Sequence, residues 1–586
     1  MTNPADLLPR LAQQLNEGDA AAAEALIATS FPGAPPAQGK HLIGTAWCSI
    51  GRFDQAIPVL REAARFAPGH PGILMTLMRA LIDNGQPEEA LAFPFQTQNP
   101  AALLALWRTR AEAAFKASDA PEEAAALVRV TELDLGDHGG RERLAALLVG
   151  LDRADDALAH VDQLPTSRSV LRIRANALAQ LDRTDEAKAI DRAALADDAD
   201  DKEAWLALVL LADRTADDAT LSAMIEHGDR QGYARSEVDY ARALLAKREG
   251  RLDDALSLAE GSETPFDPSR RFALIATLAD RLGNADRAFA AARSRAAAIP
   301  GADHWRRRAA AHRERLRQAI DALDTIAPAA RASAPERASP AFLVGFPRSG
   351  TTLLDTFLMG HPDVVVVEEK GMLEAAAMEL GAPQAADEQA VARARAAYFE
   401  ELDRHVAAER RGRLIIDKLP LAMTGAATIN RLFPDAPIIF AQRHPADSLV
   451  SNMLQAFRLN DAMANFLDLE DAAEFYDLAL RLWFKSKEVL RLDTFDIVYE
   501  RLIDDPEASI RPLVDWLGLT WKPAMMDHRS TAKSRGLIAT PSYDQVTQPL
   551  HNRAAGRWRR YAHQLSPVNA TLDKWAQTLG YGLMTE

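Results

Sequence analysis

AFLVGFPRSGTT, residues 341–352, gives the strongest indication of fold in the second half of the chain. Residues 341–346 are a short apolar run typical of a buried parallel strand, and a new apolar run begins at Leu353. Between the two runs, glycine and proline bend the backbone. This pattern predicts a strand, a loop and a helix, with backbone N–H groups and the positive end of the helix dipole aimed at one point. The residues expected to hold an anion there are Arg348, Ser349, Gly350, Thr351 and Thr352.

The loop departs from the Walker A motif at one position, because Thr351 stands where that motif requires lysine. A nucleoside triphosphatase uses this lysine to hold the β and γ phosphates. The present loop carries Arg348 instead, a planar cation with several donors that suits a tetrahedral anion. The expected ligand is therefore phosphate-like but not ATP with magnesium. The alternative is a strand-to-helix turn without a ligand.

Short apolar runs alternate with helical segments beyond residue 340, which predicts an α/β fold with a parallel sheet. The expected strands are Ala341–Phe346, Val364–Val367, Leu414–Ile416, Pro437–Ala441 and Phe495–Val498. Charged and polar groups follow these strands, at Glu368, Glu369, Lys370, Asp417, Lys418, Arg443, Tyr499 and Glu500. Because ligands gather at the carboxyl ends of parallel strands, these residues are expected to form one site.

A second anion site is expected after the fourth strand. Arg443 ends that strand, Pro445 suits the first turn of a helix, and Ser448 and Ser451 share one face of that helix. The alternative is a capped junction whose serines face solvent. Two separate anion sites in one sheet, without a Walker lysine, suggest a nucleotide with phosphates at both ends of its ribose.

Residues 341 to about 565 resemble the sulfotransferase family that uses 3′-phosphoadenosine 5′-phosphosulfate (PAPS), and within it the tyrosylprotein sulfotransferase branch. PRSGTT at 347–352 is similar to the family's 5′-phosphosulfate loop, and Arg443 with Ser451 to its 3′-phosphate motif. Further matches are His361–Val364, Glu368–Glu369, Lys418, Tyr499–Glu500, Ser542–Val546 and Arg557–Trp558. The resemblance implies a PAPS-dependent sulfotransferase that transfers a sulfuryl group to a hydroxyl acceptor.

The resemblance also implies roles for individual residues. Glu369 corresponds to the catalytic base, while Arg348, Lys418 and Ser542 would donate to the transferring group. The 3′-phosphate and ribose side would be held by Arg443, Ser451, Tyr499 and Arg557. No metal is required, and the sequence has no histidine and cysteine cluster that would bind one. The acceptor stays open between a protein tyrosine, a sugar hydroxyl and a small molecule.

The first half of the chain repeats itself with a period of 34 residues. Gly51 with Ala56 recurs as Gly85 with Ala90, and Ala124 follows after the same interval. Weaker copies are Asp152 with Ala157, Asp182 with Ala187, Gly250 with Ala255, and Gly283 with Ala288. These positions resemble the tetratricopeptide repeat, which implies an all-α solenoid of about seven to nine helix pairs.

The expected domains are a repeat superhelix over 1–326, a linker over 327–340 and a sulfotransferase domain over 341–586. The concave groove of the repeats is expected to bind a peptide, a protein partner or the acceptor. The alternative is a spacer or a dimerisation arm, so a homodimer stays open. The arginine-rich helix around Trp305–Arg317 is expected to be a solvated cap of the array.

Composition narrows the function further. The formal charge of −15 argues against a general nucleic-acid-binding protein, which needs a basic face. The single cysteine, Cys48, fits a reducing compartment and is expected to be a small core residue. No stretch predicts an export signal or a membrane span, so a cytoplasmic protein is expected.

Two other functions compete with the sulfotransferase interpretation. One is a P-loop kinase or NTPase, which would need magnesium and the lysine that Thr351 replaces. The other is a repeat scaffold with an inactive nucleotide domain, which would not bind adenosine 3′,5′-bisphosphate.

Overall fold

The computed structural model describes residues 4–151, 153–264, 267–329, 337–534 and 555–583. The chain divides into two compact units, Met1–His227 and Gly228–Glu586. No helix among the described residues has the length and apolar character needed to cross a membrane.

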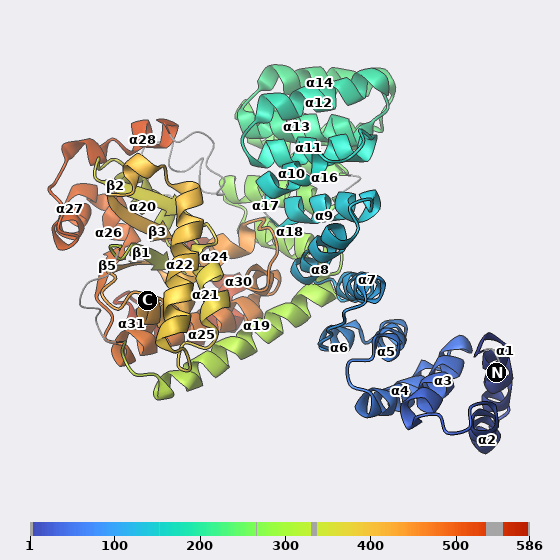
Figure 1. Cartoon of the computed structure of the whole chain (residues 1–586). Coiled ribbons are helices and arrows are strands. Elements are labelled where there is room, and N and C mark those ends of the chain that lie inside the picture. Colours follow the sequence, from blue (N-terminus) through green and yellow to red (C-terminus); the bar gives the residue numbers. More distant parts are fainter. Residues whose placement is uncertain (1–3, 152, 265–266, 330–336, 535–554, 584–586) are drawn as a thin grey trace. The chain divides into compact units, whose positions relative to one another are not determined.

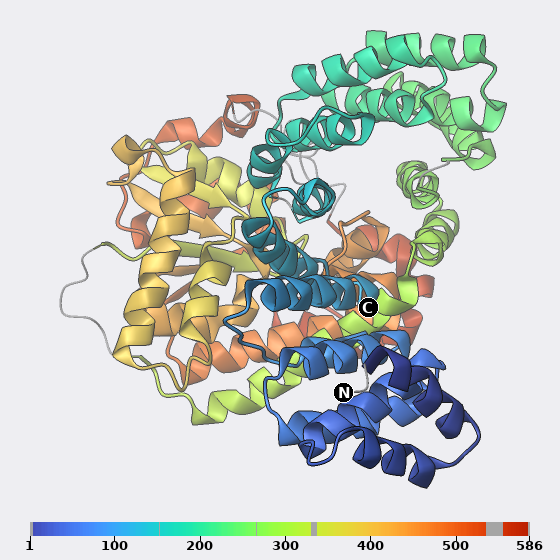
Figure 2. The same ribbon diagram turned by 45° about the vertical axis from the view of Figure 1, so that its right-hand side comes forward.

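The first unit is built from antiparallel pairs of helices, visible in Figure 2. Its helices are α1 Pro4–Asn16, α2 Ala20–Ser30, α3 Pro36–Ser49, α4 Phe53–Phe66, α5 Pro71–Asp83, α6 Pro87–Leu91, α7 Pro100–Lys116, α8 Ala120–Leu133, α9 His138–Gly150, α10 Ala154–Val161, α11 Arg168–Gln180, α12 Thr184–Asp197, α13 Lys202–Thr215 and α14 Asp218–Gln231, the last of which crosses the unit boundary.

The repeat positions found in the sequence have clear structural roles. Ala56, Ala90 and Ala157 are completely buried where paired helices pack, because a larger side chain would force the helices apart. Gly51 and Gly85 lie in the turns between helices with φ of 73° and 74°, a conformation that side chains other than glycine's disfavour. The predicted helical repeat is therefore confirmed in this unit.

The second unit combines five more helices of the array with an α/β layer (Figure 1). The helices are α15 Arg235–Arg248, α16 Leu252–Gly261, α17 Ser269–Arg281, α18 Ala285–Ala298 and α19 Ala302–Ala322. The strands are β1 Ala341–Gly345, β2 Val364–Glu368, β3 Leu414–Lys418, β4 Ile438–Gln442 and β5 Thr494–Val498. All strand pairs are parallel and the order is β2-β3-β1-β4-β5. The predicted fold class, an all-α repeat array followed by an α/β domain with a parallel sheet, is confirmed.

Both faces of the sheet are buried. Along β1, Phe342 and Val344 point into one hydrophobic cluster while Ala341 and Leu343 point into another, as the two-residue period of a strand requires. The first cluster is covered chiefly by α22 Glu388–His405, α23 Ala426–Leu432, α24 Pro445–Leu454, α25 Leu469–Val489 and α31 Asn569–Thr578. The second is covered by α20 Thr351–Met359, α26 Tyr499–Asp504, α27 Pro506–Trp516 and α28 His528–Ser534.

The chain leaves β1 and β4 toward opposite faces of the sheet. Helix α20, which follows β1, packs in the second cluster, whereas α24, which follows β4, packs in the first. Neighbouring parallel strands whose connections diverge in this way open a crevice at their carboxyl ends, where ligands of α/β proteins bind. The loop at residues 346–350 lies at this crevice.

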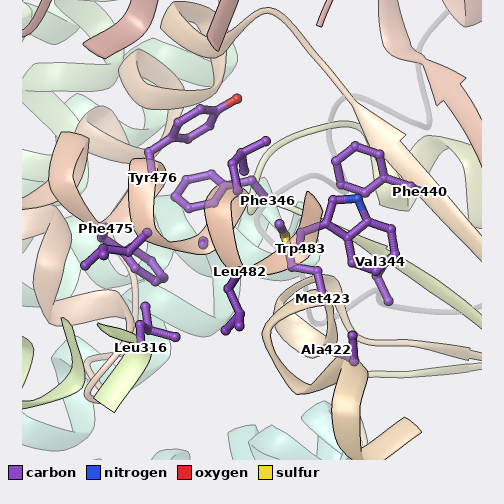
Figure 3. Close-up of a cluster of buried hydrophobic side chains, with 14 of the residues drawn as sticks. Leu316, Val344, Phe346, Ala422, Met423, Phe440, Phe475, Tyr476, Leu482 and Trp483 are labelled. Carbon is purple, nitrogen blue, oxygen red and sulfur yellow. The ribbon is translucent and has the colours of Figure 1, made fainter. Parts of the chain in front are cut away.

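Helices α17 to α19 share the hydrophobic core of the sheet. Leu316 and Ile320 of α19 and Phe289 of α18 belong to the same cluster as Val344 and Trp483. Figure 3 shows Leu316, Val344 and Trp483 in this cluster. The expectation of a solvated cap around Trp305–Arg317 is wrong, because this helix packs on α25 and on the turn η4 Met463–Leu467. Arg313 is 8% exposed and pairs with Asp471 and Glu474.

The predicted linker over 327–340 can be compared with the structure only at its two ends, because residues 330–336 lie outside the described part of the chain. At its edges the Ala329 backbone N–H donates to Asn430, and Arg337 forms a two-bond ion pair with Asp403. Both ends of the segment are thus attached to the α/β layer, and the domain boundaries themselves stay a prediction.

Candidate active site

The loop between β1 and α20 has an unusual backbone. Arg348 has φ of 68° and Gly350 has φ of 94°, so both lie in the left-handed region. A residue other than glycine is held in this region only at a cost, and such positions cluster at ligand sites. The loop turns the chain so that α20 starts at Thr351, with its first N–H groups at the crevice. Ser349, Thr351 and Thr352 are all buried beside it.

Close contacts explain the two loop glycines. A Cβ atom added to Gly345 would meet the Ala441 carbonyl oxygen of β4 at 2.5 Å, and one added to Gly350 would overlap the ring of Tyr499. The Ser349 hydroxyl is buried and has no hydrogen-bond partner among the described residues. Because buried hydroxyls are nearly always paired, this oxygen fits a site that a polar ligand completes.

Three residues of β4 and α24 bind the loop directly. Arg443 donates from Nη1 to the Arg348 carbonyl oxygen at 2.9 Å, and Arg348 donates from Nε to Ser451 Oγ at 3.1 Å. Asn452, which is fully buried, donates to the Pro347 carbonyl oxygen at 2.9 Å. Residues of the two predicted anion sites are therefore joined by hydrogen bonds, and the group that they form around Arg348 is called the pocket below.

Positive charge accumulates in this pocket. Burial, and then the positive charges of Arg443 and Arg557, lower the pKa of Arg348 to about 10, so the guanidinium still carries its charge at neutral pH. Buried cations that repel one another are stabilised by an anion placed among them. The arrangement thus favours a phosphate or sulfate group, and the predicted binding residues Arg348, Arg443, Ser451 and Arg557 lie in one pocket.

Tyr499 and its neighbours form one wall of the pocket. The Arg443 guanidinium lies 4.7 Å from the centre of the Tyr499 ring, a cation–π contact. Burial raises the pKa of Tyr499, so its hydroxyl stays protonated. Glu500 accepts the His444 backbone N–H at 3.0 Å and the Tyr581 hydroxyl at 2.7 Å. Glu500 therefore supports the strand end, whereas Tyr499 faces Arg443.

A carboxylate of α24 fixes the turn η7 Arg557–Tyr561. Asp447 is 1% exposed and accepts the backbone N–H groups of Gly556 at 2.6 Å and Trp558 at 2.8 Å. The Trp558 ring stacks on His444 at 5.0 Å. Asp447 and Ser451 are four residues apart on one helix face, so the turn that carries Arg557 is placed beside Ser451.

The other half of the site surrounds Lys418. Its ammonium is 2.7 Å from Glu369 Oε1, 3.1 Å from Glu368 Oε1 and 3.6 Å from Asp355 Oδ2. Lys418 and Asp355 are completely buried. Burial alone lowers the pKa of a lysine, but the three carboxylates, Asp355 first, outweigh it and raise the pKa of Lys418. Lys418 is therefore a permanent cation with three acceptors around it.

Glu369 lies at the rim of this half. Its side chain is 44% exposed, its φ is 49° and its backbone N–H donates to the Lys418 carbonyl oxygen at 2.8 Å. The left-handed backbone turns Glu369 out of the strand direction while Lys418 holds its carboxylate. The charge of Glu369 also influences the pKa of Arg348, so the two halves of the site are electrostatically connected.

Asp417 precedes Lys418 but points to the other face of the strand. It is 2% exposed and accepts the Tyr398 hydroxyl at 2.8 Å. Burial raises the pKa of Asp417 to about 7, the hydrogen bond from Tyr398 opposes this rise, and Glu374 adds to it. Asp417 thus belongs to a buried polar pair beneath the site.

Ser542, expected to contact the transferring group, lies outside the described residues. The structure adds three residues that were not on the predicted list: Asp355, Asn452 and Asp447. A carboxylate inside the apolar run Leu353–Met359 was a usable signal for Asp355. No local signal marks Asp447 or Asn452, since polar residues in the first or last turn of a helix are common.

The first unit contains a cavity of about 1020 Å³ lined chiefly by α3, α5 and α7. His41, Cys48, Thr76, Arg79 and Arg108 are among its lining residues. Cys48 is half-buried, so its expected place in the core is wrong, and burial raises the pKa of its thiol to about 11. The described residues contain no group of three or more histidine, cysteine, aspartate or glutamate side chains placed to hold a metal ion.

Comparison with known proteins agrees with this geometry. Residues 340–523 match the model of the sulfotransferase family, and residues 51–93 match that of the tetratricopeptide repeat. The first match contains the loop, β1 to β5 and the residues Glu369, Lys418, Arg443, Ser451 and Tyr499.

Individual relatives are distant. An uncharacterized protein of Aquifex aeolicus is 26% identical over 250 residues, which are 40% of this chain and 32% of that protein. Protein-tyrosine sulfotransferase 2 of Gallus gallus is 24% identical over 270 residues, 41% of this chain and 71% of the relative. The solved sulfotransferase domain from the curacin biosynthetic pathway is 16% identical, with a TM-score of 0.30 over 42% of this chain and all of that domain.

The expected resemblance is thereby confirmed in both parts of the sequence. The likeness to the sulfotransferase family covers residues 340–523, and the likeness to the tetratricopeptide repeat covers residues 51–93.

Proposed function

We propose that this protein transfers the sulfuryl group of PAPS to a hydroxyl acceptor. The observation that carries the proposal is one crevice with two unlike halves: a cationic pocket around Arg348, and a carboxylate, Glu369, held by a buried lysine. A site that only binds a nucleotide needs the first half. Transfer to a hydroxyl needs the second as well, because the acceptor must lose a proton.

The residues present fit the donor. The loop offers N–H groups at the start of α20 and the Ser349 hydroxyl, while Arg443, Ser451 and Arg557 line a second position for an anion. When bound, PAPS supplies an activated sulfuryl group and leaves as adenosine 3′,5′-bisphosphate. Arg348 lies between the two positions, so its charge can offset the negative charge that grows on the leaving phosphate.

Glu369 is the residue that would accept the acceptor's proton. It is exposed enough to meet a substrate, and its carboxylate is held at 2.7 Å from Lys418. Lys418 is charged at neutral pH and has Asp355 and Glu368 as further partners. It therefore orients Glu369 and brings positive charge to the reaction centre without needing to donate its proton.

We further propose that the acceptor is a protein or peptide bound by the repeats. The support is the cavity of about 1020 Å³ in the first unit, which combines apolar side chains with Arg79, Asp83, Arg108 and Glu112. Mixed apolar and charged walls suit an extended peptide, for which solenoids provide long concave surfaces. Several relatives are named protein-tyrosine sulfotransferases. A sugar or small-molecule hydroxyl is the other outcome of the test below.

Calorimetry with adenosine 3′,5′-bisphosphate tests the donor. We expect binding, about 10-fold or more weaker binding of adenosine 5′-monophosphate, which lacks one phosphate and its charged hydrogen bonds, and none of ATP with magnesium. Absence of binding to the bisphosphate would show that the domain is an inactive scaffold. Binding of ATP with magnesium and its hydrolysis would show a P-loop NTPase.

Incubation of cell extract with the protein and PAPS, followed by mass spectrometry for an added sulfuryl group, identifies the acceptor. The full-length variant Thr45→Arg, which fills the groove, is expected to reduce modification of a protein acceptor while leaving bisphosphate binding unchanged. The substitution Arg65→Ala on α4, outside the residues that line the cavity, is the matched control. If Thr45→Arg modified the acceptor as well as the wild type does, the groove would not be the acceptor-binding site.

A further inference from the structure

Helix α17 of the repeat array reaches the turn that carries Arg557. Asp280, in its last turn, lies 3.4 Å through Oδ2 from Arg557 Nη1 and accepts the Tyr561 hydroxyl at 2.6 Å through Oδ1. Arg560 donates to the Asp280 carbonyl oxygen at 3.2 Å. Asp280 and Arg557 are 17% and 16% exposed, so this ion pair is largely shielded from water.

The same turn is attached to the donor pocket on its other side. Its backbone N–H groups at Gly556 and Trp558 are bound by Asp447 of α24, one helical turn before Ser451. The charge of Arg557 contributes to the lowered pKa of Arg348, after burial and the charge of Arg443, so Arg557 is near enough to act on the cations of the pocket. Arg557 thus lies between a carboxylate of the array and the cations of the pocket.

A second contact joins the array to the same pocket. Arg295 of α18 is 5% exposed and donates to the carbonyl oxygens of Met453 and Leu454, both at 3.0 Å. These are the last carbonyls of α24, the helix that bears Ser451. Cations at a helix C-terminus satisfy its unpaired carbonyls, so α18 fixes the end of α24 while α17 fixes the turn beside it.

We propose that Asp280 is a positioning residue for the donor: the repeat array supplies the carboxylate that holds Arg557 toward the 3′-phosphate side of the pocket. The inference rests on the proposed function, because it assumes that the pocket binds adenosine 3′,5′-bisphosphate. It makes the end of the array a structural part of the nucleotide site. Backbone contacts to Asp447 hold the turn, and Asp280 orients the side chain that the turn carries.

Removing the charge of Asp280 changes nucleotide affinity in opposite directions for the two possible roles, orienting Arg557 and competing with the phosphate for Arg557. If Asp280 only competed with the phosphate for Arg557, removing its charge would strengthen nucleotide binding. If Asp280 orients Arg557, removing it leaves a mobile guanidinium that must be ordered when the nucleotide binds, and affinity falls. Partners that orient a ligand-binding group typically contribute about 10-fold to affinity, as at metal sites.

Asp280→Asn is the principal variant, since asparagine keeps one oxygen that can accept from Tyr561 but removes the charge and the second oxygen, which faces Arg557. We expect about 10-fold weaker binding of adenosine 3′,5′-bisphosphate by calorimetry, a similar rise in KM for PAPS and little change in kcat. Asp286→Asn is the matched control: Asp286 lies on α18 and accepts Gln564, but it does not contact Arg557. Its affinity should equal that of the wild type. Unchanged or stronger binding by Asp280→Asn would overturn the proposal.

A double-mutant cycle separates positioning from a general loss of structure. In an Arg557→Gln background, Asp280→Asn should have no further effect on affinity, because the side chain that it orients is absent. Additive losses would show that Asp280 acts through the fold alone. Asp280→Glu, which keeps the charge, should recover part of the affinity, and a loss equal to that of asparagine would count against the proposal. A wild-type protein that does not bind the bisphosphate would instead refute the proposed function.

Discussion

The two halves of the candidate site are built from the same strand ends but have opposite charge balance. Around Arg348 three guanidinium groups come together, and burial with mutual repulsion lowers the pKa of Arg348 to about 10. Around Lys418 a single cation meets three carboxylates, and the pKa of Lys418 is raised. In the first half cations predominate, with Asp280 paired to Arg557 and Asp447 close to Arg443, whereas the second half has three carboxylates around one cation.

This difference indicates which half needs a ligand. A cluster of cations is stabilised by binding an anion. We therefore expect electrostatic attraction to provide the anion affinity of the Arg348 half. The cation of the Lys418 half already has carboxylate partners, and the partly exposed Glu369 is the one proposed to accept a proton while Lys418 and Asp355 stay buried. The comparison predicts that substitutions in the two halves change different measured quantities.

The largest effect is expected for Glu369→Gln. Loss of the base should reduce the turnover of PAPS by about 10²- to 10⁴-fold, while affinity for adenosine 3′,5′-bisphosphate changes by less than about twofold. Turnover is measured as release of the bisphosphate in the presence of the extract that contains the acceptor. Glu368→Gln, an equal change on the neighbouring residue, should cost much less. Full turnover in Glu369→Gln would assign the base elsewhere.

Lys418→Met should destabilise the protein by about 3 to 5 kcal/mol, because it leaves the fully buried Asp355 without its cation. The loss is measured as the decrease in the free energy of unfolding of the second unit in urea. Lys487→Met, which removes a partly exposed lysine paired with Asp496, should cost less than about 1 kcal/mol. Similar losses in both variants would mean that the carboxylates around Lys418 are neutral, contrary to the proposed charge balance.

Arg443→Gln should weaken binding of adenosine 3′,5′-bisphosphate by about 1.5 to 3 kcal/mol, the usual contribution of a charged hydrogen bond. Its effect on the rate at saturating donor should be small, because the residue belongs to the binding half. Arg404→Gln on the exposed face of α22 is the control for loss of one positive charge. If Arg443→Gln lowered the rate at saturating PAPS but left the affinity for the bisphosphate unchanged, Arg443 would belong to the reacting half and not to the binding half.

The smallest effect is a pH dependence that comes from Asp417. Burial raises the pKa of Asp417 to about 7 in the folded protein, against an ordinary value of 3.8. Between these values the folded state binds more protons than the unfolded state, so stability falls as pH rises and levels off above pH 7. The expected loss is about 1.4 kcal/mol between pH 6 and pH 8.

The variant Asp417→Asn isolates the contribution of Asp417 to the pH dependence of stability, because asparagine can still accept a hydrogen bond from Tyr398 but does not titrate. Urea midpoints measured between pH 6 and pH 8 should fall less steeply in the variant than in the wild type. Parallel curves would show that Asp417 does not titrate in this range.

Much of the fold was predictable because its signals are local. All five strands lie within about a residue or two of their expected positions, since short apolar runs bounded by turns identify buried parallel strands. The loop at residues 346–350 and the helix beginning with Pro445 in its first turn were likewise confirmed. The arginine-rich helix α19 was misjudged, because charge along a helix does not reveal that Arg313 would be buried against Asp471 and Glu474.

The residue types expected at the site could be read from the sequence alone. Residue types and their order along the chain specified an anion loop without a Walker lysine, a second arginine with its serine, and a carboxylate after β2, and the strand pattern placed all of them at one edge of a sheet.

The partners of these groups became visible only in the folded structure. Lys418 meets Asp355, Glu368 and Glu369 because parallel pairing brings β1, β2 and β3 side by side. Asp280 meets Arg557 across 277 residues of sequence because the last repeat helices share the core of the sheet. Periodicity and motifs report neighbours along the chain, whereas contacts between distant segments arise from packing, and packing has no local signature.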